Sequence, residues 1–250
     1  MSKSRYVTGL RAVEQLLSSG AEGIRQIYAE YQTENPRVQA AIAEARKAGI
    51  EVQAANRARL TQISGEARHQ GIVAEVRRST VIDEATLRTI VEERLQRDDS
   101  RLVLLLLDGV QDPHNLGACL RTADAAGVDA VVVPRHGAAG LGATVSKVAA
   151  GAAEQLPFVP VSNLGKVVQW LKEYGVRCIG TSDRATISLF DADLSGSVAL
   201  VMGREHTGLS KGIASRCDQL VSLPMQGVVP SLNVSVATGI CLYEIVRQNP

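Results

Sequence analysis

The feature that most constrains the fold of this chain is a series of aliphatic runs in its second half. The segments LVLLLL, AVVV and VALVM contain no polar residue. Because none of them alternates apolar with polar positions, each predicts a strand that is buried on both faces. Helical patterns separate these runs, which is typical of a mainly parallel sheet with helices on both sides. The sequence therefore predicts an α/β fold.

The pattern of apolar residues also predicts the individual strands and helices of this second half. Strands are expected at Leu102–Leu107, Ala130–Val133, Phe158–Val161, Val176–Thr181, Val198–Met202 and Gln219–Leu223, and helices at Leu116–Ala126, Ala143–Ala149, Leu164–Glu173, Ser210–Arg216 and Leu232–Arg247. Aromatic residues make up only 3% of the chain. The core must therefore consist of Val, Leu, Ile and Ala.

The first half forms a smaller unit of alternating helices and strands. Helices are expected at Gly9–Leu17, Arg37–Ala48 and Arg57–Ile63, and strands at Ile24–Ala29, Glu51–Ala54 and Gly71–Val76. The segment Ser79–Ser100 is mostly polar and predicts a linker with a weakly packed amphipathic helix. We therefore expect three parts: residues 1–79, a linker at 80–100, and residues 101–250.

The charge of the chain is unevenly distributed. Residues 1–80 hold 12 Lys and Arg against 8 Asp and Glu, whereas residues 81–250 hold 15 against 18. A basic first part favours contact with a polyanion such as RNA, and Arg57, Arg59, Arg68, Arg77 and Arg78 are its candidate phosphate ligands. The alternative is a solvated charged face.

The four cysteines give no sign of a metal site or a disulfide framework. Cys119, Cys178, Cys217 and Cys241 form no C-x-x-C pair, and no histidines are spaced with them. We expect reduced, buried thiols and no metal. The sequence MSKSRYVTGL lacks the apolar core of a signal peptide, and no apolar run is long enough to span a bilayer. We therefore expect a soluble, cytoplasmic protein.

Three loops rich in Gly and polar residues follow predicted strands. They are DGVQDPHNLGACLR (Asp108–Arg121), MGREHTGLS (Met202–Ser210) and LPMQGVVPSLNVS (Leu223–Ser235). Ligands of parallel sheets bind at the carboxyl ends of strands, where these loops meet. The sequence therefore predicts the functional site there.

Each loop contains polar residues with both a structural and a functional interpretation. Asn115 stands where a helix N-cap is expected, and Arg121 follows six residues later among small side chains, where an anionic partner would suit it. Glu205 is either a solvated loop residue or a site residue. Ser231 and Asn233 could cap the last helix or take part in chemistry. A dinucleotide site is disfavoured because GLGATV at Gly140 lacks the third Gly and follows no strand.

Taken together, the three loops resemble the motifs of the SpoU/TrmH class of RNA ribose 2′-O-methyltransferases, which have the SPOUT fold. The matching segments are NLGACLRTA from Asn115, ALVMGRE from Ala199, closing with Gly208-Leu209, and SLNVSVA from Ser231. In the first half, GLRAV at Gly9 and HQGIVA at His69 resemble the substrate-binding domain of the subgroup that methylates 23S rRNA.

The resemblance implies several further properties. It implies a C-terminal α/β-knot domain with a trefoil knot, an N-terminal L30e-like RNA-binding domain, S-adenosylmethionine as cofactor and a homodimer. By position, Asn115, Arg121, Glu205, Ser231 and Asn233 are expected to form the catalytic set. Gly203, Leu223 and Leu232 are expected to touch the cofactor, largely through backbone groups.

The resemblance also suggests a substrate, a guanosine in the peptidyl-tRNA-binding loop of 23S rRNA. A tRNA 2′-O-methyltransferase of the same class and a non-catalytic RNA-binding or ribosome-assembly factor remain alternatives. The sequence departs from the family pattern at His206-Thr207 and at Pro230, which affects the expected loop shape. Arg121 is either the base or a phosphate clamp that stabilises developing negative charge, and we favour the clamp because a guanidinium is a poor base.

Overall fold

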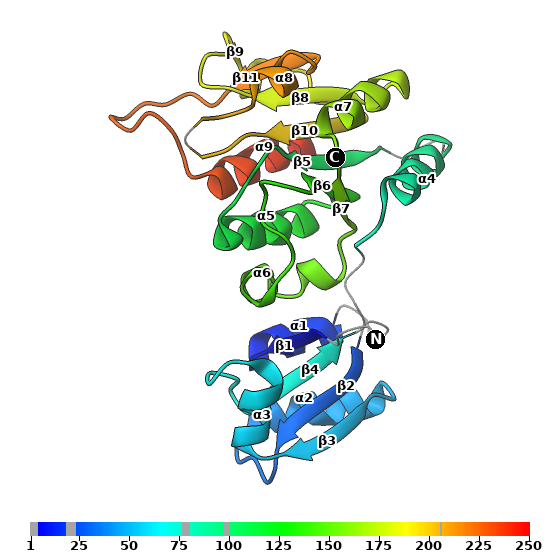
Figure 1. Cartoon of the computed structure of the whole chain (residues 1–250), viewed down its shortest axis with the longest axis vertical. Coiled ribbons are helices and arrows are strands. Elements are labelled where there is room, and N and C mark those ends of the chain that lie inside the picture. The colour runs from blue at the N-terminus through cyan, green and yellow to red at the C-terminus, as the bar shows by residue number, and fades with distance from the viewer. Residues whose placement is uncertain (1–4, 19–23, 77–80, 98–100, 206) are drawn as a thin grey trace. The chain divides into compact units, whose positions relative to one another are not determined.

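The structure is a computed structural model that describes residues 5–18, 24–76, 81–97, 101–205 and 207–250. The chain divides into two compact units, shown in Figure 1. Unit 1 contains residues 1–80 together with Leu141–Gln155, and unit 2 contains Val81–Gly140 and Leu156–Pro250. Each unit is described by itself.

Unit 1 is built on a four-stranded sheet in the order β1-β4-β2-β3. Its strands are β1 (Arg5–Thr8), β2 (Ile24–Glu30), β3 (Glu51–Ala55) and β4 (Ile72–Val76), and its first three helices are α1 (Leu10–Ser18), α2 (Pro36–Lys47) and α3 (Arg57–Ser64). The β1 strand, absent from the sequence prediction, pairs antiparallel with β4. Asn35 and Asn56 cap α2 and α3 through their side chains, which explains where these helices begin.

The two faces of this sheet are covered differently. Ile27, Ile72 and Ala74 pack with α1 and α2 in one apolar cluster. On the other face a smaller cluster joins Val73 to Leu60 of α3. Residues 141–155, with α6 (Ala143–Ala149) and the short helix η2 (Ala152–Glu154), also belong to unit 1, where Lys147 pairs with Glu66 at 3.1 Å.

Unit 2 contains a seven-stranded sheet in the order β7-β6-β5-β10-β8-β11-β9, and every pairing in it is parallel. The strands are β5 (Val103–Leu107), β6 (Ala130–Pro134), β7 (Phe158–Val161), β8 (Arg177–Thr181), β9 (Ile187–Ser188), β10 (Val198–Met202) and β11 (Gln219–Ser222). The α/β prediction is confirmed, and among these strands only the two-residue β9 was not predicted.

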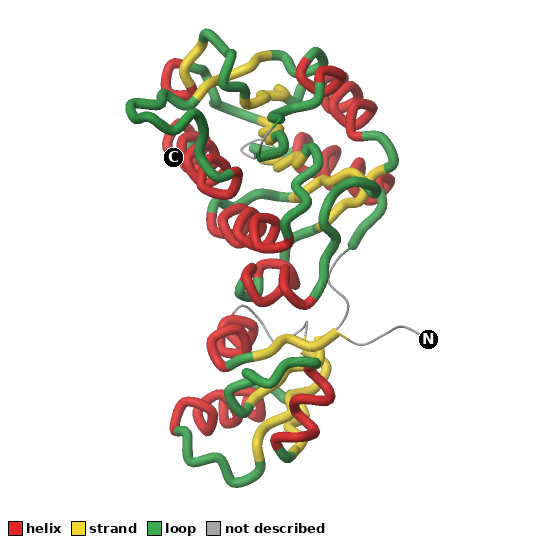
Figure 2. The backbone as a smooth tube through the Cα atoms, turned by 60° about the vertical axis from the view of Figure 1, so that its left-hand side comes forward, coloured by secondary structure: helices red, strands yellow, loops and turns green. Residues whose placement is uncertain are grey.

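Helices lie on both sides of this sheet, as Figure 2 shows. The helices of unit 2 are α4 (Glu84–Leu95), α5 (Pro113–Ala125), α7 (Leu164–Glu173), α8 (Lys211–Ala214) and α9 (Val234–Gln248), with the short helix η3 (Leu189–Asp191). Leu102, Leu104 and Leu106 pack in one cluster with α4, α7 and α8. Because side chains alternate along a strand, Leu105 and Leu107 point to the opposite face, where α5 and α9 pack against each other.

The helix expected to be weakly packed in the linker belongs to the core of unit 2. Leu87 and Val91 of α4 are fully buried against the sheet. Trp170 of α7 donates from Nε1 to Glu84, and the Arg88 guanidinium lies 4.3 Å above the Trp170 ring. The polar composition of this segment concealed a helix that buries only a narrow apolar stripe.

Candidate functional site

The three loops singled out in the sequence follow strands of one sheet. The adjacent strands β5 and β10 bring the loop after Leu107 beside the loop after Met202. The backbone N–H of Asp108 donates to Met202 O at 2.7 Å, and the nearly buried Asp108 carboxylate accepts from Ser210 N at 2.8 Å. These bonds fix the start of the first loop against the second.

A chain of side-chain hydrogen bonds joins all three loops. The Asn233 Oδ1 accepts from Ser235 N at 2.8 Å and from Ser235 Oγ at 2.6 Å, and Asn233 Nδ2 donates to Asn115 Oδ1 at 2.9 Å. Asn115 Nδ2 in turn donates to Glu205 Oε1. We refer to Ser235, Asn233, Asn115 and Glu205 as the amide chain. Every donor in it points toward the Glu205 carboxylate.

The role of Asn115 differs from the expected N-cap. Helix α5 begins one turn earlier, at Pro113, and its cap is Asp112, whose side chain accepts from His114 N at 2.9 Å. Proline suits the first helical position because it has no N–H to leave unpaired. Asn115 therefore lies inside the first turn, where its amide is available to the other loops.

Asn233 is both the N-cap of α9 and a member of the site. It caps α9 through Ser235 N, and its Nδ2 remains to bind Asn115. The positive end of the α9 helix dipole therefore lies at the start of the amide chain, and the negative Glu205 carboxylate lies at its end. The two charges at its ends favour one direction for the donors and acceptors along the amide chain.

The loop that carries Glu205 is held by close backbone packing. A Cβ built on Gly203 would lie 2.1 Å from the Gly208 carbonyl carbon and 2.2 Å from Leu209 N, so only Gly fits. Arg204 and Gly208 exchange two backbone hydrogen bonds of 3.0 Å. Gly208 has φ +65°, a conformation that favours Gly. Glu205 thus lies at the tip of a tight turn.

Two expected site residues lie outside this network. Arg121 and Ser231 are exposed, and the side chain of neither forms a hydrogen bond or ion pair with any other residue that the structure describes. On α5, a separation of six residues places Arg121 roughly 120° around the helix from Asn115. The structure thus brings together Asn115, Glu205 and Asn233, and leaves Arg121 and Ser231 accessible to a ligand.

The nearby thiol of Cys119 is not arranged as a nucleophile. Burial raises the pKa of Cys119 to about 11, although a contact with Thr238 Oγ1 at 3.6 Å opposes the shift. Since the thiolate is the reactive form, this residue stays inert near neutral pH. No group of three His, Cys, Asp or Glu side chains suited to a metal ion occurs within the described ranges.

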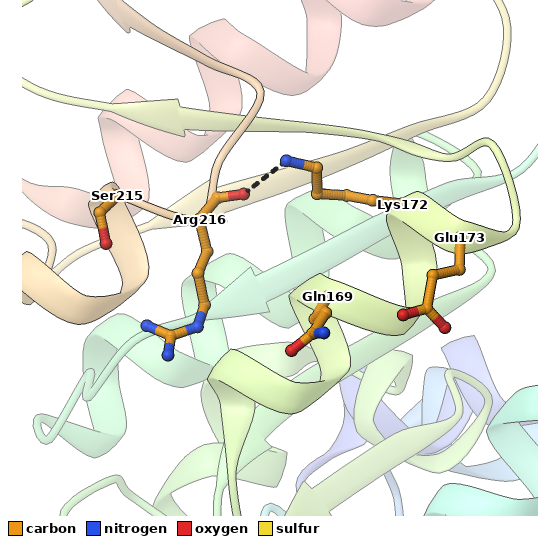
Figure 3. A pocket seen from close by; sticks show the side chains of 5 residues that line it. All are labelled: Gln169, Lys172, Glu173, Ser215 and Arg216. Carbon is orange, nitrogen blue, oxygen red and sulfur yellow. Dashed lines mark hydrogen bonds between the residues drawn. The ribbon is translucent and has the colours of Figure 1, made fainter.

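A pocket of about 470 Å³ lies elsewhere, on the face covered by α7 and α8, and Figure 3 shows its lining. Its residues are Gln169, Lys172, Glu173, Ser215 and Arg216. The Lys172 ammonium donates to Arg216 O at 3.1 Å and pairs with Asp218 at 2.9 Å, and the hydrogen bond to Asp218 raises the pKa of Lys172. Because Lys172 is already paired and the lining includes no residue of the amide chain, this pocket is not the candidate site.

Comparison with known proteins identifies the family. Residues 102–243 match the SpoU rRNA Methylase family, and residues 6–81 match the description "RNA 2'-O ribose methyltransferase substrate binding". The first match covers more than half of the chain and includes the whole amide chain. The chain belongs to the SpoU rRNA methylase family.

Similar proteins support this membership over the full length. The 23S rRNA (guanosine-2'-O-)-methyltransferases RlmB of Ralstonia nicotianae and Shewanella oneidensis are 45% and 46% identical, over 99% of this chain and 97% and 99% of theirs. The SpoU methyltransferase AviRb from Streptomyces viridochromogenes, crystallised with AdoMet, superposes with a TM-score of 0.76 at 26% identity, over 98% of this chain and 90% of that chain.

S-adenosylmethionine is the cofactor of the SpoU family, and the loops of this chain offer groups that suit it. Leu223 and Leu232 are half-buried at the two ends of the third loop. Between them, the backbone N–H groups of Met225 to Val229 and of Ser231 bond to no other residue in the described parts of the chain. Such a segment can bind a nucleoside through apolar contact and backbone hydrogen bonds.

The sequence analysis did not single out every residue that shapes this site. Ser235 fixes the Asn233 amide, and Asp108 holds the second loop, but neither was singled out. The available signals were an Asn two residues before a Ser at a helix start and an Asp directly after a buried strand. His206, a departure from the pattern, lies outside the described residues. Thr207 and Pro230 are exposed.

Among the helices within the described ranges, none combines the length and the apolar character that crossing a bilayer requires.

Proposed function

We propose that this chain is a 23S rRNA (guanosine-2′-O-)-methyltransferase that acts in the cytoplasm during ribosome maturation. The observation that carries the proposal is the amide chain, in which Asn233 of the third family motif bonds to Asn115 of the first, and Asn115 bonds to the Glu205 carboxylate of the second. The proposed target is a guanosine in the peptidyl-tRNA-binding loop. The full-length similarity to the two RlmB enzymes supports the choice of rRNA.

The residues of this chain would position the ribose and assist loss of its proton. S-adenosylmethionine supplies the methyl group, and Gly203, Leu223 and Leu232 would hold it, largely through backbone groups. Asn115 fixes one oxygen of Glu205, which leaves Oε2 to orient the ribose. Methyl transfer depends strongly on alignment, so this positioning is expected to contribute much of the rate.

Arg121 would bind the phosphate next to the target ribose. It is exposed and its side chain forms no hydrogen bond with another described residue, so its five N–H donors are available to an anion. A guanidinium keeps its proton in proteins, which argues against its acting as the base. It would stabilise negative charge that develops on the 2′-oxygen while RNA phosphate takes the proton. Ser231, also exposed, completes the proposed set.

The proposal includes a homodimer with a trefoil-knotted catalytic domain and an L30e-like N-terminal domain. On α9, Val236 and Tyr243 are large apolar or aromatic side chains that are about half exposed. Val228 and Val229 of the third loop are also exposed. Exposed apolar side chains near a site favour a partner surface, and a second copy of the chain would cover them.

The test is methyl transfer from labelled S-adenosylmethionine to a 23S rRNA fragment. Arg121→Ala is expected to lower the rate about 100-fold, the scale of losing one charge-stabilising donor. Its affinity for S-adenosylmethionine, measured by calorimetry, is expected to stay unchanged. Turnover like that of the wild type would remove Arg121 from the mechanism. Mapping 2′-O-methyl groups on total RNA with and without the protein identifies the substrate, and a difference confined to tRNA would overturn the rRNA assignment.

A further inference from the structure

The sheet of unit 1 has one face that its helices cover only in part. Helix α3 packs Leu60 and Ile63 against Val73, Tyr6 and Tyr28 at one end of this face. The remainder is polar, and strands β2 and β3 face the viewer there in Figure 1. Five of its side chains come from alternate strand positions, namely Gln26, Tyr28, Glu51, Gln53 and Glu75, and Arg25 joins them at the register shift between Ile24 and Gln26. We call these six residues the open face.

A hydrogen-bonded network organises the open face around a buried carboxylate. Glu75 is only 7% exposed in its side chain, and it accepts from Arg25 at 3.2 Å. The Tyr28 hydroxyl lies 3.1 Å from Glu75 Oε2 and 3.2 Å from Gln26 Oε1. Gln26 Nε2 donates to Gln53 Oε1 at 3.2 Å. Arg25, Tyr28 and Gln26 therefore hold fixed positions, and the row ends on an exposed amide.

Some hydrogen-bond donors of this network have no partner among the described residues. Gln53 Nε2 has two N–H donors, and neither is used there. Exposed amides on a fixed framework can bond the edges of nucleobases, as Asn and Gln do in nucleic-acid recognition.

Aromatic rings lie next to these amides. The rings of Tyr6 and Tyr28 meet edge to face, with centroids 6.3 Å apart, and both residues are half-buried. Half-buried tyrosines on a sheet can stack with unpaired bases at little cost in conformational entropy. This pair is the one ring–ring contact of unit 1 within the described residues.

The charge beside the open face fits a polyanion. Helix α3 carries Arg57 and Arg59, both exposed, and has no acidic residue. Arg59 lies close enough to oppose the rise in pKa that burial and Glu75 impose on Tyr28. Between α3 and β4 the exposed Arg68 adds a further charge, and Glu66 is paired with Lys147. Arg77 and Arg78 lie outside the described residues.

We propose that the open face binds unpaired bases of the rRNA loop that presents the target nucleotide. Gln26 and Gln53 would bond base edges, Tyr6 and Tyr28 would stack with a base, and Arg59 would bind a phosphate. This inference rests on the proposed rRNA methylation and assigns the substrate-binding surface for it. Single-stranded RNA is the committed occupant because amides and rings read bases that a duplex conceals.

The test measures binding of the full chain to a fluorescent RNA that contains the single-stranded loop. The double variant Gln26→Ala/Gln53→Ala is expected to weaken binding about tenfold, comparable with losing contacts to one base. Gln39→Ala is the matched control, because this exposed glutamine lies on α2, which covers the opposite face. Its affinity is expected to stay within about twofold of the wild type.

The charge at the rim is tested separately. Arg59→Ala is expected to reduce the slope of log affinity against log salt by about one, and the glutamine variant is expected to leave it unchanged. Arg46→Ala on α2 is the matched arginine control and should keep the slope. Glu51→Gln, which removes an exposed carboxylate at the edge of the open face, is expected to tighten binding.

Methylation kinetics complete the test. The double glutamine variant should raise KM for RNA, with kcat at saturating RNA and affinity for S-adenosylmethionine unchanged. Unchanged RNA affinity and KM would overturn the inference, as would an equal loss of affinity for a fully paired duplex. If the wild type binds the loop but methylates no rRNA, the proposed function fails and the assignment of the RNA surface does not.

Discussion

Asn233 donates to Asn115 across 2.9 Å, although the two residues are 118 positions apart in the chain. The bond makes the helix cap of α9 part of the candidate site, since the same Asn233 side chain accepts from Ser235 at the first turn of that helix. Formation of the last helix and orientation of the Glu205 carboxylate are therefore linked. The geometry of both loops therefore depends on the packing of α5 against α9.

The amide chain can be tested at its central residue. Asn115→Ala removes the bonds to both Asn233 and Glu205, so we expect kcat to fall about 100-fold because the carboxylate loses its orientation. Binding of S-adenosylmethionine, measured by calorimetry, is expected to change little. Asn35→Ala provides the control, because it removes an asparagine cap of α2 in unit 1. The control should lower stability by about 1 kcal/mol and leave kcat intact. Equal kcat values for both variants would contradict the role of Asn115.

Gly203 offers a test of the turn that carries Glu205. An added Cβ would overlap the backbone of Gly208 and Leu209, so Gly203→Ala must move the whole turn. We expect loss of measurable S-adenosylmethionine binding and a lower Tm. Gly212→Ala in α8 is the matched control, since its Cβ would meet only Arg216 Nη1 at 3.5 Å. This control is expected to keep binding and to gain up to about 1 kcal/mol of stability. Wild-type binding by Gly203→Ala would show that the turn tolerates displacement.

The fold of unit 2 was largely predictable because burial on both faces removes polar residues from a strand. The strands Phe158–Val161 and Val198–Met202 match the prediction at both ends. The prediction missed β1 and β9, since both are short edge strands with polar residues. An edge strand needs little apolar surface, and its pairing partner is distant in sequence.

The sequence indicated candidate residues for the site but not the contacts among them. Loop composition and family motifs indicated Asn115, Glu205 and Asn233, but the bonds among them depend on where α5 begins. The prediction started this helix at Leu116, whereas Asp112 and Pro113 start it one turn earlier. Because of that shift, Asn115 does not cap the helix, and its side chain bonds instead to Asn233 and Glu205. Arg121 was expected in one catalytic set with Glu205, Ser231 and Asn233, and its side chain bonds to none of them.

Because α4 belongs to the core of unit 2, shortening one of its buried side chains is expected to lower the free energy of unfolding strongly. Leu87 is fully buried, so Leu87→Ala should lower the free energy of unfolding by about 2 to 5 kcal/mol. Thr89→Ala, on the exposed side of the same helix, serves as the control and should change it by less than about 0.5 kcal/mol. Urea titrations of both variants measure the difference. A loss below 1 kcal/mol, the value expected of a loose linker helix, would mean that α4 does not belong to the core.

The buried cysteines predict how stability depends on alkaline pH. Burial raises the pKa of Cys119 to about 11 and that of Cys178 and Cys241 to about 12. Unfolded thiols ionise near pH 8.5, about three units lower. Below that pH both states are protonated, and the contribution to stability is fully present. As pH rises toward 11 and 12 only the unfolded chain releases these protons, so the free energy of unfolding must fall.

Urea unfolding at about pH 8 and about pH 10 measures this decrease. Replacing Cys241 by Ala should reduce the pH dependence, because one of the shifted groups is lost while the helix keeps a residue of high helix propensity. The same burial predicts that iodoacetamide modifies these three thiols far more slowly in the folded protein than in urea, since only the thiolate reacts. Modification of the folded protein at the rate of the unfolded chain would mean that α5 and α9 open on the timescale of the reaction, and that the amide chain they support is not a stable arrangement.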